Sequence, residues 1–147
     1  MNTSQAILER WFARTAESYS PQALPFIKGN ADRFRNPVGH TLREGLGTLL
    51  EQVLGSMDTN SIAPALDAII RIRAVQDLAA SEAVGFVFCL KAIVRDLAPE
   101  QDQAMLDGRI DQLALMAFDT YMRCREQVAD IRVNESLRSV RARQGTG

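Results

Sequence analysis

The chain has 147 residues, a length that fits one domain with a sizeable buried core. Hydrophobic residues make up 46% and charged residues 24%, which is typical of a globular protein and excludes a disordered chain. The net charge is −1, so no overall field favours nucleic acid or an anionic membrane surface. No apolar run approaches the roughly 20 residues that span a membrane, and two cysteines without paired spacing favour a cytoplasmic location.

The first half of the chain is predicted to form three helices, at residues 4–18, from Val38 to near Gly55, and from Ser61 to residue 78. Residues 4–18 are predicted to form a helix with Ser4 as its N-cap. One face of this helix is marked by residues at helical spacing, namely Leu8, Trp11, Phe12, Thr15 and Tyr19. Two prolines in residues 20–25 end this helix, and a short helical turn is expected at 27–34. A strong amphipathic helix follows and ends near Gly55, with its apolar positions at Val38, Leu42, Leu46, Leu49, Leu50 and Val53.

Ser61 is expected to cap the third helix, with Pro64 in its first turn. This helix continues through residues 71–78, and its apolar face comprises Ile62, Leu66, Ile69 and Ile70. Residues 81–97, capped by Ser81, are apolar around most of the helix circumference, which predicts a central position in the core.

The last helix is predicted from about residue 100 to at least 131. Its stripe steps by four and three residues, a heptad rhythm, through Ile110, Ala114, Ala117, Tyr121, Cys124, Val128 and Ile131. Further apolar residues on neighbouring faces predict burial on several sides, at Leu106, Leu113, Leu115, Phe118 and Met122. We therefore predict an all-α protein of five or six helices, with one domain at 1–135 and a solvated or frayed tail at 136–147.

The only histidine, His40, follows Asn36-Pro37, a pair typical of a helix start because Asn caps and Pro fits the first helical position. Helix geometry places His40 with Glu44 on the polar side, and no second metal ligand or catalytic partner is suitably spaced. Gly45 and Gly47 follow no strand, so they indicate close helix approach rather than a phosphate loop. We predict no catalytic residues, no metal site and no cofactor.

Two further features leave alternatives open. Arg71 and Arg73 interrupt an apolar run, and we expect them to belong to a solvated face. The alternative is that Arg73, Gln76 and Lys91 form a polar patch that binds an anion or a partner. Cys89 and Cys124 are expected to be small buried hydrophobic residues, with a redox or metal pair as the alternative.

Three segments together carry a resemblance to a known family: NPVGHTLREGLGTL, IIRIRAVQDLAASEAVGFVFCLK and FDTYMRCREQVADIRVNE. They resemble the N-terminal domain of the RsbRD-type RsbT co-antagonist proteins, over about residues 8–135. The resemblance implies a globin-like helical input module without haem that pairs as a dimer in stress-signalling complexes called stressosomes. No histidine lies on the helices from residue 61 onward, where a haem ligand would be needed.

In that family the module usually precedes a phosphorylatable STAS domain, whereas this chain stops soon after the last predicted helix. We expect either a protein that acts through a separate partner or a piece cut from a longer protein. The leading hypothesis is a non-enzymatic regulatory or sensory domain, homodimeric through the Ile110–Ile131 stripe together with the first helix, unless that stripe is only the intramolecular core. The alternative is a small-ligand or cofactor binder with an apolar pocket between residues 81–97 and the last helix.

Overall fold

A computed structural model describes residues 2–19, 37–76 and 78–145, and within these ranges it contains helices and no strand. The helices are α1 (Thr3–Ala16), α3 (Pro37–Leu54), α4 (Thr59–Ala74), α5 (Ala80–Val84), α6 (Phe86–Leu97) and α7 (Gln103–Gly145). Within the described ranges, the predicted all-α class, the five or six helices and the long last helix are confirmed. The helical turn predicted at 27–34 lies outside the described residues.

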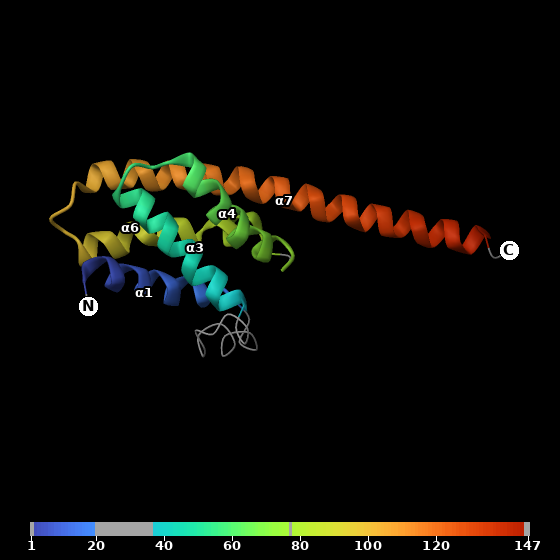
Figure 1. Ribbon diagram of the computed structural model, residues 1–147, viewed down its shortest axis with the longest axis horizontal. Helices are drawn as coiled ribbons and strands as arrows, with labels where there is room; N and C mark the ends of the chain where they lie inside the picture. The colour runs from blue at the N-terminus through green and yellow to red at the C-terminus, as the bar shows by residue number, and fades with distance from the viewer. Residues whose placement is uncertain (1, 20–36, 77, 146–147) are drawn as a thin grey trace.

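Helix α7 forms the long axis of the molecule (Figure 1). Its first half packs against α3, α4, α5 and α6, while α1 packs against α3 and α6 on the other side of the bundle. The second half of α7 extends beyond all the other helices, and the C-terminus lies far from the N-terminus (Figure 1). One buried core therefore fills the space between α1 and the first half of α7.

Helix α1 begins at a different cap from the predicted one. The side chain of Asn2 accepts a hydrogen bond from the Gln5 backbone N–H at 2.8 Å, and the Gln5 side chain accepts from the Asn2 backbone N–H, so Asn2 is the N-cap and Ser4 is not. Four of the five residues of the predicted face are buried, namely Trp11, Phe12, Thr15 and Tyr19, whereas Leu8 is only partly buried and Ile7 is fully buried instead. Trp11 fixes the helix on α6 through a hydrogen bond from its indole N–H to the Phe86 carbonyl, at 2.7 Å.

Helix α3 has Pro37 as its first residue, and Gly45 allows α4 to approach it closely. A Cβ atom at Gly45 would lie 2.7 Å from Ile69 Cδ1, whereas a Cβ atom at Gly47 would meet only Leu8 Cδ2 at 3.7 Å. The predicted role in close helix approach is thus confirmed for Gly45.

The next two predicted helices differ from the structure at their ends. Asp58, not Ser61, caps α4, so Pro64 lies in the second turn, and α4 ends at Ala74 instead of continuing to residue 78. The predicted helix at 81–97 is divided at Gly85 into α5 and α6, and Ser81 lies inside α5 instead of capping it. Helix α6 is also not buried on all sides, as a central position in the core would require, because Phe88 is 48% exposed.

Arginines of α7 close the C-termini of two other helices. The last carbonyls of a helix lack intrahelical partners and carry a partial negative charge, which favours a cationic donor. Arg109 Nη1 donates to the carbonyls of Val53 and Gly55 at the end of α3, at 2.8 and 2.6 Å. Arg125 Nη1 donates to the Ala74 carbonyl at the end of α4, at 2.7 Å. These contacts fix α7 along the ends of α3 and α4.

The two sides of α7 differ in burial. Five of the seven residues in the predicted stripe, from Ile110 to Cys124, are buried in the core of this chain; Val128 is half-buried and Ile131 is exposed. Leu106 and Leu113 are buried as predicted, but the expected burial of Leu115, Phe118 and Met122 is wrong. From Ala129 to Gln144 every residue is exposed, and the helix continues to Gly145.

Candidate functional site

An exposed apolar row lies on the side of α7 that faces away from the core. We call it the outer row, and its members Leu115, Phe118 and Met122 are 69%, 44% and 43% exposed. Their spacing of three and four residues places them on one helix face, and Leu115 lies about 140° around the helix from the buried Ile110. A row of large exposed apolar side chains on one face is typical of an interaction surface.

Helix α6 adds one residue beside the outer row. Two ion pairs, Lys91–Asp111 at 2.6 Å and Arg95–Asp107 at 3.0 Å, show that α6 runs antiparallel to α7. This register places Phe88, one turn before Lys91, level with the turn that contains Leu115. The Lys91 ammonium also lies 5.5 Å from the centre of the Phe88 ring.

A second exposed row continues toward the end of α7. We call it the distal row, and its members Val133, Leu137 and Val140 are each about half exposed. Val133 lies 18 residues after Leu115, which is five full helical turns, so both rows lie on the same side of the helix. Together they extend over about 38 Å, at 1.5 Å per residue.

The predicted polar patch has three members with different surroundings. Arg73 is fully buried, so the interpretation of this residue as part of a solvated face is wrong. It donates to the carbonyls of Ala83 and Glu82 at the end of α5, at 2.8 and 2.7 Å, which explains its burial. Gln76 is exposed just after α4, and Lys91 forms its ion pair with Asp111.

The guanidinium of Arg73 lies between two aromatic rings, 5.3 Å from the centre of Tyr19 and 5.2 Å from that of Phe86. Among the described residues, no hydrogen-bond partner lies within range of its Nη1 atom or of the Tyr19 hydroxyl, although the two buried side chains interact with each other. Burial raises the pKa of the Tyr19 phenol above its ordinary value of 10.0, although the nearby Arg73 lowers it in part. Helical spacing is the sequence signal that separates Arg73 from the exposed Arg71, because Arg73 lies about 20° around the helix from the buried Ile62 and Arg71 lies about 180° from it.

The histidine and the cysteines are placed apart from one another. His40 is partly exposed on α3 and its Nε2 lies 2.9 Å from Glu44 Oε2, on the polar side as predicted. Cys124 is buried and Cys89 half-buried, and both are free thiols. Burial raises the pKa of the Cys124 thiol, so it is a weak nucleophile. Within residues 2–19, 37–76 and 78–145 no group of three or more metal-ligating side chains forms.

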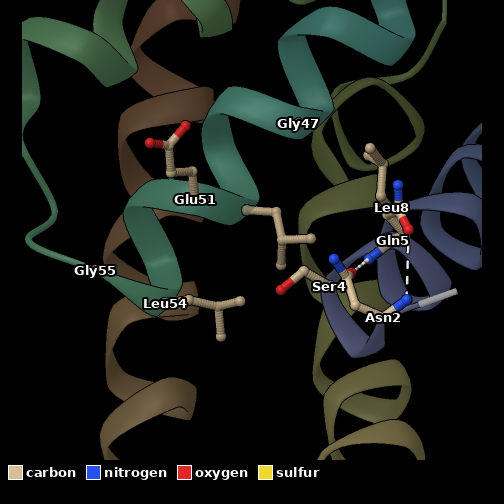
Figure 2. Close-up of a pocket in the computed structure, with 9 residues that line it drawn as sticks. Asn2, Ser4, Gln5, Leu8, Gly47, Glu51, Leu54 and Gly55 are labelled. Carbon is tan, nitrogen blue, oxygen red and sulfur yellow. Dashed lines mark hydrogen bonds between the residues drawn. The ribbon is translucent and has the colours of Figure 1, made fainter.

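An apolar groove lies between α1 and α3, with a volume of about 330 Å³ (Figure 2). Leu8, Leu50 and Leu54 line it, Gly47 leaves space beside Leu8, and Gln5 and Glu51 are among its polar residues. Its position differs from that of the pocket predicted between residues 81–97 and the last helix. The sequence signal that could have located it is Gly47, a glycine on the amphipathic helix one turn before Leu50.

Comparison with known families provides the identity. A family model described as the RsbT co-antagonist protein rsbRD N-terminal domain matches residues 5–136, which is most of the chain. The chain belongs to this family. The RsbRD resemblance found in the sequence is thereby confirmed. No curated protein and no solved structure matches the chain.

The matched region of this RsbRD N-terminal domain includes the outer row and ends inside the exposed half of α7, between Val133 and Leu137. The distal row therefore extends across the end of the family match. Among its described residues, this RsbRD N-terminal domain has no helix that is long and apolar enough to cross a membrane.

Proposed function

We propose that this RsbRD N-terminal domain is a non-enzymatic sensory or regulatory module of stressosome type, which acts in the cytoplasm by contact with a separate partner protein. Membership of the family supports a signalling role. The observation that carries the mode of action is the outer row, because Leu115, Phe118 and Met122 offer a row of apolar contacts on one helix.

The same surface supports a homodimer. Most of the predicted dimer stripe is occupied by this chain's own core, which leaves the outer and distal rows as the exposed apolar side of α7 in the described residues. Two copies of a helix that pair along such a row bury apolar side chains from both chains, as in a coiled coil. Phe88 of α6 widens this surface at the end nearer the core.

Light scattering at tens of micromolar tests the dimer. The wild-type chain is expected to have twice the monomer mass, and Leu115→Glu together with Phe118→Glu is expected to give monomers, because buried unpaired carboxylates are unfavourable in such an interface. Met105→Glu is the matched control, since Met105 is 41% exposed on α7 but lies off the row. A wild-type monomer, or an equal loss in both variants, would contradict the dimer.

A second candidate function is the binding of a small apolar ligand, and the groove between α1 and α3 favours it. Native mass spectrometry of protein purified from cells is expected to show extra mass if the groove is occupied. Gly47→Leu fills the groove and is expected to remove that mass. Gly108→Leu is the control, because a Cβ atom at Gly108 meets nothing within 4 Å. A wild-type protein without extra mass argues against this candidate.

A further inference from the structure

Three arginines line a second cavity, which α1 forms with α6 and not with α3. This cavity, of about 470 Å³, lies between α1 and α6 and is lined by Arg10, Arg14, Ala92, Ile93, Arg95 and Asp96. Its lining carries three positive charges and one negative charge, in a chain whose net charge is −1. Each of the three arginines also has a carboxylate partner, so the charges of the pairs balance, and a ligand would bind the guanidinium donors that these pairs leave free.

The three guanidinium groups are only partly used by the carboxylates around them. Arg10 forms an ion pair with Asp96, Arg14 Nε lies 3.9 Å from Glu17 Oε2, and Arg95 Nη2 lies 3.0 Å from Asp107 Oδ2. Each arginine side chain is about half exposed, so water screens these pairs and they contribute little to stability. A guanidinium has five N–H donors, so one such contact leaves most of them for a ligand.

The arrangement of the arginines indicates the kind of anion. Arg10 and Arg14 lie one turn apart on α1, and Arg95 approaches from α6, so donors reach the cavity from two walls. A phosphate group accepts hydrogen bonds on several oxygens and carries up to two charges, which suits several guanidinium groups better than a single planar carboxylate does. Ala92 and Ile93 add an apolar surface beside them, in a hollow that is widely open to solvent.

We propose that the cavity between α1 and α6 binds the phosphate group of a small phosphorylated ligand. Arg14 and Arg95 bind the phosphate oxygens through the N–H donors that their ion pairs with Glu17 and Asp107 do not use. Arg10 contributes charge while its pair with Asp96 keeps α1 joined to α6. The proposal does not depend on the dimer or on a protein partner.

Isothermal titration calorimetry with three probes at constant ionic strength tests the proposal: inorganic phosphate, AMP and adenosine. Inorganic phosphate and AMP are expected to bind saturably with dissociation constants of about 1 mM or lower. Tighter binding of AMP than of phosphate indicates that the organic part contacts Ala92 and Ile93, and equal binding indicates a site for phosphate alone. Adenosine that binds as well as AMP would overturn the proposal.

Variants locate the site. Arg14→Gln combined with Arg95→Gln is expected to weaken phosphate and AMP binding by at least tenfold, since charge-assisted hydrogen bonds are lost. Arg71→Gln is the matched control, because Arg71 is an equally exposed arginine paired with Asp67 on α4, away from the cavity. Ala92→Glu introduces a carboxylate at an exposed position and is expected to abolish binding while circular dichroism stays unchanged. No saturation by either phosphate probe, or unchanged binding in these cavity variants, would overturn the proposal.

Discussion

Replacement of the buried Arg73 by methionine is expected to destabilise the chain. The substitution keeps a long side chain of similar reach but removes the guanidinium group. It therefore removes two hydrogen bonds, to the carbonyls of Ala83 and Glu82 at 2.8 and 2.7 Å, and leaves the Ala83 carbonyl in a buried position without this donor. It also removes the cationic group between the rings of Tyr19 and Phe86.

The size of the effect follows from two opposing contributions. Two hydrogen bonds from a charged donor contribute about 3–6 kcal/mol before compensation. Removal of Nη1, which is buried with no hydrogen-bond partner in range among the described residues, restores about 1–3 kcal/mol of desolvation cost. The difference between these two ranges is a net loss of about 0–5 kcal/mol, centred on about 2.5 kcal/mol, against the 5–15 kcal/mol by which a domain of this size is typically stable.

Urea unfolding followed by circular dichroism measures this loss as a lower midpoint at an unchanged slope. Arg125→Met is the comparison, because Arg125 is only partly buried and donates to one helix-end carbonyl, that of Ala74. Its expected loss is about 1 kcal/mol. A buried charge can be replaced by an apolar side chain without loss when desolvation dominates. If Arg73→Met were as stable as the wild type or more stable, the structural role assigned to its hydrogen bonds would be refuted.

Three further outcomes are expected. Trp11→Phe should lower the free energy of unfolding by about 1–3 kcal/mol in urea titrations, because the Phe86 carbonyl loses its indole donor at 2.7 Å. The pKa of Tyr19 is raised in the folded state, so its contribution to the free energy of unfolding is present below the ordinary pKa of 10.0 and is lost as pH rises through the folded-state pKa. Tyr19→Phe should therefore flatten the decrease of the unfolding free energy above pH 10, and an unchanged slope of that free energy against pH would contradict this. Removal of residues 141–147, which follow the distal row, should change the unfolding free energy by less than about 0.5 kcal/mol, since residues 141–144 are all exposed, whereas a larger change would show that this segment packs on the domain.

The helices could be predicted from the sequence because apolar spacing records which face is buried. Leu42, Leu46 and Leu49 show this for α3, and all three are fully buried. The caps of α1 and α4 were misplaced because several capping side chains occur together, as at Asp58, Thr59, Asn60 and Ser61. Backbone geometry selects one of them, and local composition does not show which one.

The candidate surfaces were harder to predict because they depend on tertiary neighbours. Apolar residues occur on two sides of α7, and the sequence alone does not show that Ile110 faces the core while Leu115 faces outward. Helical spacing places Arg73 on the apolar face of α4, but the carbonyls of Ala83 and Glu82 become its neighbours only through the packing of α5 on α4. The arginine cavity brings residues 10 and 14 beside residue 95, a separation that no local pattern encodes.

The part of α7 after Cys124, which we call the arm, extends beyond the packed helices. Cys124 is the last fully buried residue of the helix, and Gly145 lies 21 residues beyond it, or about 32 Å along the axis. A tilt of about 10° at Cys124 would move the far end by about 5 Å, more than most rearrangements within a packed core. The insertion of one residue into this arm would rotate everything beyond it by about 100°. The number of residues in the arm therefore sets both how far and in which direction a change among the packed helices is transmitted.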